Sequence, residues 1–371
     1  MLSFLRPVDT SRVSWRGIQS SFPAYARSPA RALVTLGAAF GLLLPAPCVA
    51  SAQTPLSYLS AQGERAYPIN SLLWALLGIS IAVIIISIVF VLLGTLRGNA
   101  LPGNALPGRL MVESPRRGIG WIVVGVGTST AVLFGAAVWT VVTLAAVSSP
   151  PGGHADLYLE VTGHQWWWEV LYKDPSPSLT FKTANEIHIP AGRTVSVALR
   201  TADVIHSFWV PSLTGKTDLI PGQINQTWFS ASSSGVYRGQ CTEYCGRQHA
   251  HMAFEVFADD TAAFKAWRDH ALQLVPAPVS AEAAADVDAF VRKCGACHAV
   301  GGTRAGGILG PDLSHLMSRR TIAAGALPNS IGHLSAWIAD PQHVKPGAYM
   351  PRLDVTGPEL TRIRRFLLTL Q

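Results

Sequence analysis

Two close pairs of cysteine residues have the clearest chemical potential in this sequence. The first pair stands in Cys241-Thr-Glu-Tyr-Cys245, and His249 and Met252 follow in the same short segment. His206, from an earlier segment, supplies a second imidazole. Thiolate, thioether and imidazole ligands select copper over hard cations. A single copper ion needs one cysteine, so two favour a pair of copper ions bridged by both sulfurs.

A disulfide is the competing interpretation of this first pair, because exported proteins often join nearby cysteines. The spacing of the two cysteines alone does not separate the two readings. The neighbouring His249 and Met252, together with the distant His206, favour copper. Three further histidines have no partner at ligand spacing and are expected to be structural: His164, His188 and His251.

The second pair stands in Cys294-Gly-Ala-Cys297-His298, which has the C-x-x-C-H pattern of covalent haem c attachment. In this pattern both thiols bond to the haem and the histidine ligates iron. A thioredoxin-like redox pair or half a zinc site would use the same cysteine spacing. Neither fits well, because no second thiol pair follows and the surrounding pattern is helical.

The sixth iron ligand is expected to be a methionine, and Met317 and Met350 are the two candidates after His298. The segment from Lys345 to Met350 resembles the loop that carries the axial methionine in class I cytochromes c, so Met350 is predicted. Met317 follows a helical run and is expected to pack. Pro311 also matches that family, in which its carbonyl oxygen accepts a hydrogen bond from the ligating imidazole.

Two long apolar segments, 71–94 and 119–147, carry no charge, and each exceeds the roughly 20 residues that span a bilayer. They predict a transmembrane hairpin within residues 53–150. The segment between them contains Arg97, Arg109, Arg116 and Arg117. A short basic loop favours the cytoplasmic side, which places everything after residue 148 in the periplasm.

Three further segments are predicted after the hairpin. Residues 151–270 show short alternating runs between turns, which predict an antiparallel β-sandwich or barrel. Residues 271–280 contain two prolines and predict a stiff linker. Residues 281–371 predict a small helical domain with helices near 283–293, 331–339 and 358–370.

Residues 1–52 have the order of a secretory signal: scattered arginines, an apolar run and small residues ending at Ala52. Cleavage there would start the mature chain near Gln53 and discard Cys48. A lipoprotein in which Cys48 is acylated is less favoured because Pro47 precedes it. An uncleaved membrane helix is the other alternative.

The net charge of +7 comes from two segments, one before the first apolar segment and one between the two. Residues 1–52 have a net charge of +4, residues 97–117 have +3, and the rest of the chain is neutral. The positive charges therefore belong to the export signal and to the loop that sets the membrane topology, and no nucleic-acid partner is expected.

Several motifs resemble subunit II of cytochrome c oxidase, whose soluble domain is a cupredoxin-like β-barrel with a binuclear CuA centre. They are Gly163-His-Gln-Trp-Trp-Trp, His206-Ser-Phe-Trp-Val-Pro, Lys216-Thr-Asp-Leu-Ile-Pro-Gly and Gly239-Gln-Cys-Thr-Glu-Tyr-Cys-Gly. The resemblance implies the copper ligands His206, Cys241, Cys245, His249, Met252 and the backbone carbonyl of Glu243. It also implies that the Glu243 carboxylate reaches a Mg²⁺ ion shared with the catalytic subunit, and that Trp166 admits electrons.

One position departs from many relatives, which have an acidic residue three positions before Trp121. Here that position is Gly118, and Glu113 lies too far upstream to replace it confidently. The departure puts proton entry through this subunit in doubt.

With the haem motif added, the chain resembles the fused subunit II of caa3-type oxidases. The resemblance implies a subunit of the bacterial inner membrane that takes electrons from a donor cytochrome. They would pass through haem c and CuA to subunit I, which reduces O₂. Opposite net charges of residues 154–271 and 281–371, −3 and +3, would steer the two domains together.

Three alternative functions fit the sequence less well. A nitrous-oxide-reductase-like enzyme needs a second histidine-rich copper cluster, and a quinol oxidase subunit lacks the cysteine pair. A membrane-anchored copper chaperone or assembly factor would have an exchangeable copper site and no haem.

Overall fold

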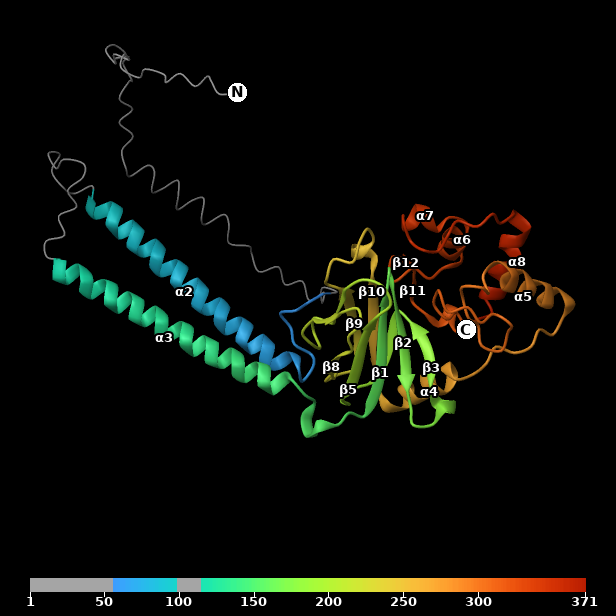
Figure 1. Cartoon of the computed structure of the whole chain (residues 1–371), viewed down its shortest axis with the longest axis horizontal. Coiled ribbons are helices and arrows are strands. Elements are labelled where there is room, and N and C mark those ends of the chain that lie inside the picture. Colours follow the sequence, from blue (N-terminus) through green and yellow to red (C-terminus); the bar gives the residue numbers. More distant parts are fainter. Residues whose placement is uncertain (1–55, 99–114) are drawn as a thin grey trace, which may run out of the picture. The chain divides into compact units, whose positions relative to one another are not determined.

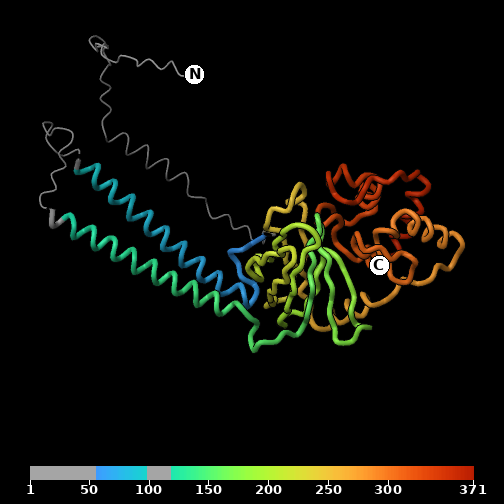
Figure 2. Tube along the Cα trace, viewed as in Figure 1, coloured from blue at the N-terminus to red at the C-terminus, as the bar shows by residue number. Residues whose placement is uncertain are grey.

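The computed structural model describes residues 56–98 and 115–371. The predicted secretory signal and most of the basic loop lie outside the described residues. Residues 54–371 belong to one compact unit, which contains the apolar helices and both predicted cofactor domains. Figure 2 follows this unit from the apolar helices (blue to green) to the C-terminal domain (orange and red).

The two long apolar segments form α2 (Ala66–Gly98) and α3 (Pro115–Val147), which confirms the predicted pair of helices. Both helices continue beyond the uncharged segments. Their large apolar side chains face outward along most of their length, and Trp121 is 77% exposed. Such continuous apolar surface is characteristic of helices that face lipid.

The segment after α3 forms a sandwich of two five-stranded sheets, as predicted for a cupredoxin-like domain (Figure 1). The strands of the first sheet lie in the order β3 (Phe181–Ala184), β2 (Trp167–Lys173), β1 (Leu157–His164), β5 (Val195–Thr201) and β8 (Asn225–Phe229). The strands of the second sheet lie in the order β4 (Glu186–Pro190), β10 (Ala253–Asp259), β9 (Gly235–Cys241), β6 (His206–Trp209) and β7 (Thr217–Leu219). Trp168, Phe208, Phe229 and Phe254 fill the core.

The strand pairing differs from a purely antiparallel arrangement. β1 pairs in parallel with β5, and β10 pairs in parallel with β4. A parallel pair needs a crossover connection rather than a tight turn. The alternating hydrophobic pattern indicates which face of a strand is buried but not which strand lies beside it. The parallel pairs were therefore not predictable from the pattern.

Helix α4 (Thr261–Ala271) ends the β-domain and was not predicted. Asp260 caps its first turn, because its Oδ1 accepts hydrogen bonds from the amides of Ala262 and Ala263, both at 2.9 Å. Phe264 and Trp267 pack against the β-domain core. The helix ends at the residue where the linker was expected to begin.

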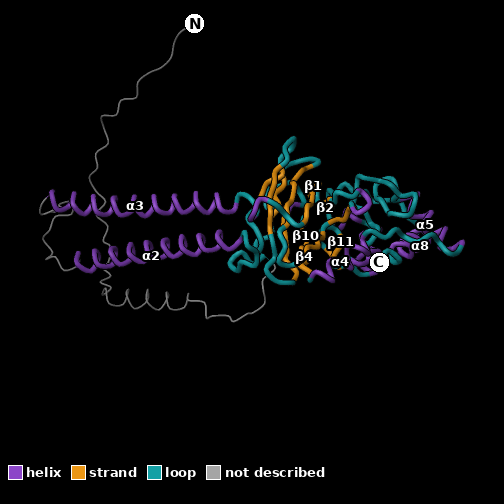
Figure 3. Tube along the Cα trace, turned by 90° about the horizontal axis from the view of Figure 1, so that it is seen from below, coloured by secondary structure: helices purple, strands orange, loops and turns teal. Residues whose placement is uncertain are grey.

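The C-terminal segment is a helical domain, as predicted. Its elements are α5 (Ala281–Lys293), β11 (Thr321–Ile322), β12 (Leu327–Pro328), α6 (Ile331–Ala339), α7 (Pro341–Val344) and α8 (Gly357–Leu367). Phe290 of α5 packs on Phe366 of α8 with ring centroids 5.1 Å apart. A capping box between Thr356 and Glu359 starts α8. Figure 3 separates these helices (purple) from the strands of the β-domain (orange).

Candidate metal centres

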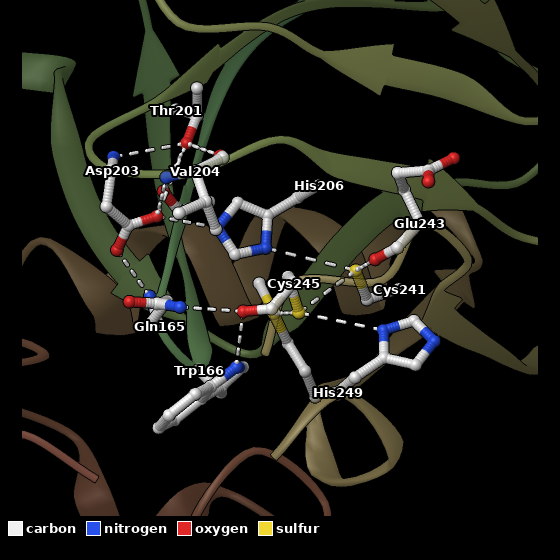
Figure 4. A network of polar contacts seen from close by, with 12 residues as sticks. Gln165, Trp166, Thr201, Asp203, Val204, His206, Cys241, Glu243, Cys245 and His249 are labelled. Atoms are coloured by element: carbon white, nitrogen blue, oxygen red, sulfur yellow. Dashed lines mark hydrogen bonds and ion pairs between the residues drawn. The ribbon is translucent and has the colours of Figure 1, made fainter. Parts of the chain in front are cut away.

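Neighbouring strands bring the residues of the first cysteine motif together. His206 begins β6 and Cys241 ends β9, and these two strands pair. The loop from β9 to β10 carries the rest of the cluster. Its base is closed by a hydrogen bond of 3.0 Å from the Cys241 amide to the Met252 carbonyl. The predicted ligands therefore converge from two strands and one loop (Figure 4).

The donor atoms of this cluster lie close together. The distances from Cys245 Sγ are 3.8 Å to Cys241 Sγ, 3.6 Å to His249 Nδ1 and 3.9 Å to Met252 Sδ. Cys241 Sγ lies 3.9 Å from His206 Nδ1 and 3.3 Å from the Glu243 carbonyl oxygen. Both cysteines are free and buried. Two sulfurs surrounded by three other side-chain donors and one carbonyl fit a pair of soft metal ions.

The protonation of the two thiols is coupled. The hydrogen bond between the two thiols lowers the pKa of Cys241 and raises the pKa of Cys245. The cluster therefore already favours one thiolate. Loss of the second proton would accompany metal binding, because metal ligands must be deprotonated.

Asp203 orients the His206 ring and was missed by the sequence reasoning. Its Oδ1 lies 2.8 Å from His206 Nε2, so Nδ1 faces the sulfur of Cys241. The amide of Gln165 donates to Asp203 Oδ2 at 2.7 Å and fixes the carboxylate. Burial opposes charge on His206, but Asp203 and Cys241 raise the pKa of the imidazole overall. The clue in the sequence was that Asp203 stands three residues before His206, a candidate ligand.

Trp166, Trp167 and Trp168 have different surroundings. Trp166 is buried and its Nε1 donates to the Cys245 carbonyl at 3.0 Å, beside the cluster. Trp167 stacks on His164, with centroids 4.3 Å apart. Trp168 packs in the core. Trp166, the predicted electron-entry residue, thus contacts the carbonyl of Cys245, a predicted copper ligand.

The other candidate residues lie outside the donor cluster. His188 Nδ1 lies 2.7 Å from Asp259 Oδ2, and His251 Nδ1 lies 2.7 Å from Gln248 Oε1. The Glu243 carboxylate points away from the sulfurs (Figure 4) and lies 3.7 Å from Lys216 Nζ. Its side chain is 44% exposed and is therefore accessible from outside the domain.

The second cysteine motif follows the end of α5. The amides of Cys297 and His298 both donate to the Cys294 carbonyl, at 3.0 and 2.9 Å. His298 Nδ1 donates to the Pro311 carbonyl at 2.8 Å, which leaves Nε2 as the nitrogen for iron. Burial lowers the pKa of His298 and favours the neutral ligand. A Cβ atom on Gly310 would lie 2.7 Å from the His298 ring, so glycine is required there.

The two methionine candidates occupy different environments. Met317 packs against the hydrophobic core of the helical domain. Met350 is half-buried on the loop that follows α7. Gln342 holds this loop, because its Nε2 donates to the carbonyls of Ala348 at 2.8 Å and Met350 at 2.7 Å. The two cysteines and the oriented His298 fit covalent haem attachment with a histidine ligand, and Met350 as the sixth ligand stays a prediction.

Comparison with known proteins agrees with both sites. Residues 175–258 match the family "Cytochrome C oxidase subunit II, periplasmic domain", and residues 284–371 match the cytochrome c family. The chain is 37% identical over 224 residues to cytochrome c oxidase subunit 2 of Alkalihalophilus pseudofirmus, covering 60% of this chain and 64% of that protein. It is 31% identical over 228 residues to cytochrome c oxidase subunit 2 of Bacillus sp. PS3, covering 57% and 62%.

A solved structure is also similar, that of the periplasmic domain of subunit II of cytochrome oxidase from Bradyrhizobium japonicum. It is 34% identical, with a TM-score of 0.30, and the match covers 32% of this chain and 94% of that domain. The chain spans less than two thirds of the length of the two curated relatives. Residues 175–258 and 284–371 therefore correspond to a cytochrome c oxidase subunit II periplasmic domain followed by a cytochrome c domain.

Proposed function

We propose that this chain is the electron-input subunit of a bacterial haem-copper oxidase. Helices α2 and α3 would anchor it in the inner membrane after removal of residues 1–52, with both cofactor domains in the periplasm. A donor cytochrome would deliver electrons to the cytochrome c domain, and subunit I would receive them from the copper domain. The observation that carries the proposal is the convergence of the two cysteines, two histidines and Met252 in the same chain as the C-x-x-C-H motif.

The copper pair would be held by His206, Cys241, Cys245, His249, Met252 and the Glu243 carbonyl. When bound, it supplies a one-electron acceptor. The protein excludes water, since His206, both cysteines and Met252 are buried. Asp203 holds the His206 ring in place, and the paired strands fix the cysteine loop.

The haem would be attached through Cys294 and Cys297 and ligated by His298 and Met350. When bound, it supplies a one-electron donor. A methionine ligand gives a higher potential than a second histidine would. The Pro311 carbonyl orients the His298 ring, and Gln342 holds the Met350 loop.

Two finer roles concern the partner subunit. The Glu243 carboxylate would help to bind Mg²⁺ at the interface with subunit I, which its exposure and outward direction support. Gly118, in α3, cannot carry a proton, so we infer that this subunit lends no acidic group to proton entry at that position.

The burial of the copper ligands also favours a resident centre over a copper chaperone. A chaperone must release its metal to a partner, which requires an accessible site. Here the sulfurs of Cys241, Cys245 and Met252 are enclosed by the domain core.

The proposed electron order can be tested in the assembled oxidase with Cys297→Ser and Cys245→Ser as a reciprocal pair. Stopped-flow reduction by a donor cytochrome should show slow copper reduction in Cys297→Ser, because the haem is no longer attached by that thiol. Cys245→Ser should retain rapid haem reduction. Copper reduction as fast in Cys297→Ser as in the parent would contradict the order.

A further inference from the structure

A buried lysine of the cytochrome c domain contacts the β-domain beside the copper cluster. Lys345 is 3% exposed, and its Nζ donates to the Trp166 carbonyl at 2.7 Å and to the Ala323 carbonyl at 3.0 Å. Lysine is almost never fully buried unless its charge finds partners. Here one of the partners is the backbone of the residue whose ring contacts Cys245.

The same loop places an aromatic ring against Trp166. The Tyr349 and Trp166 rings lie nearly parallel, with an interplanar angle of 16° and centroids 6.5 Å apart. Tyr349 Oη donates to Gln165 Oε1 at 2.9 Å, and Gln165 Nε2 donates to the Cys245 carbonyl at 2.7 Å. Figure 4 shows Gln165 and Trp166 converging on that carbonyl. Two adjoining side chains therefore connect Tyr349 with Cys245.

The backbones of the two loops also fit one another. Gln248 Nε2, in the cysteine loop, donates to the Pro346 carbonyl at 2.8 Å. Gly347 has a φ of +87°, and a Cβ there would lie 3.4 Å from the Arg247 side chain. Glycine at position 347 therefore permits the close approach of the two loops. Within the β-domain, a Cβ on Gly246 would lie 3.0 Å from Gln165 Nε2, so glycine there leaves room for Gln165 beside the cysteine loop.

We propose that residues 345–350 dock the cytochrome c domain on the copper loop, and that Tyr349 and Trp166 form the electron route between the two domains. The segment ends at Met350, the proposed iron ligand, so docking and haem ligation share one loop. This inference rests on the proposed function. When both groups are bound, one electron would pass from a reduced haem held by His298 and Met350 to an oxidised copper pair held by Cys241 and Cys245. No bond or proton is exchanged.

Docking of this kind predicts behaviour different from charge steering. An encounter guided by the opposite net charges of the domains weakens as salt shortens the Debye length from about 10 Å at 0.1 M to about 3 Å at 1 M. Buried hydrogen bonds from Lys345 and Gln248 are screened much less. The rate of electron transfer between the domains should therefore change little with salt.

Three variants separate docking from conduction in the full-length, cofactor-loaded protein. Lys345→Met keeps the apolar stem and removes the donor to two carbonyls, and Tyr349→Leu removes the ring. Tyr349→Phe removes only the hydroxyl. Lys265→Met and Tyr158→Leu are matched controls, because both residues are exposed and lie away from the cysteine loop.

Flash-induced transfer from haem to copper should slow by about tenfold or more in Lys345→Met, because this variant leaves two carbonyls at the contact without their hydrogen-bond donor. Tyr349→Leu should slow it similarly, and Tyr349→Phe should retain most of the rate. Amide hydrogen exchange, which needs no turnover, should quicken in residues 165–168 and 345–350 of Lys345→Met. The controls should match the parent in both measurements.

Unchanged exchange and unchanged transfer in Lys345→Met would overturn the docking role. If Lys345→Met fails to fold, Tyr349→Leu still decides the route, because Tyr349 is 73% exposed and its replacement is tolerable. A parent-like rate in Tyr349→Leu would overturn the route. A parent protein with no transfer from haem to copper would overturn the proposed function instead, and hydrogen exchange would still test docking.

Discussion

Glu186, at the start of β4, should make stability depend on pH in a direction unusual for a carboxylate. Its side chain is buried, with the residue 5% exposed, and the Arg320 amide donates to Glu186 Oε1 at 2.7 Å. Burial raises the pKa of Glu186 from its usual 4.5 to about 7, although Arg319 and the Arg320 amide oppose this shift. Glu186→Gln keeps an acceptor oxygen and removes the titration.

The sign follows from proton binding. The folded protein holds this proton more tightly than the unfolded chain, so the stabilisation is complete below the unfolded pKa and is lost as pH rises through the folded pKa of about 7. Between pH 5 and pH 8, the linkage relation gives a loss of about 2.5 kcal/mol in the free energy of unfolding. Glu186→Gln should not show this loss, because glutamine does not titrate.

Urea unfolding of the full chain, followed by tryptophan fluorescence at a series of pH values, measures the effect. The stability of Glu186→Gln relative to wild type should rise by about 2.5 kcal/mol from pH 5 to pH 8. Glu282→Gln is the control, because Glu282 is exposed and pairs with Arg365 at the surface. Parallel pH profiles for wild type and Glu186→Gln would refute the reasoning.

Three further predictions concern the metal centres. Asp203→Ala should weaken copper binding by about 10- to 100-fold in a chelator competition, because the His206 ring loses its orienting carboxylate; an unchanged affinity would count against that role. Cys245→Ser should abolish the spectrum of a binuclear copper centre while the haem stays covalently bound, and loss of haem would contradict the separation of the two domains. Met350→Ala should lower the haem potential in a redox titration and leave copper binding intact; an unchanged potential would exclude Met350 as the ligand.

Features with local causes were predictable from the sequence. The two membrane helices follow from uncharged apolar length, and α6 was predicted with its bounds because its apolar pattern is strong. The cysteine motifs are short, so the sequence placed Cys241, Cys245, His249 and Met252 in one segment, and the distant His206 completed the predicted set. Helix α4 was missed because it follows strand β10 directly, although Asp260 offered a capping clue.

Features that join distant parts of the chain were not predictable. The parallel pairing of β1 with β5 depends on where the intervening segments cross, which periodicity does not report. The position of Lys345 against Trp166 depends on two domains packing together. Net charge suggested a steered encounter between the domains, whereas the structure shows specific buried contacts between them.

Electron paramagnetic resonance and near-infrared spectra of the copper-loaded, full-length protein will decide whether Cys241 and Cys245 hold two copper ions. We expect hyperfine structure from one electron shared equally between two copper nuclei, and an absorption band that Cys241→Ser and Cys245→Ser each remove. Hyperfine structure from a single copper nucleus, or a spectrum that survives loss of either cysteine, would contradict this assignment.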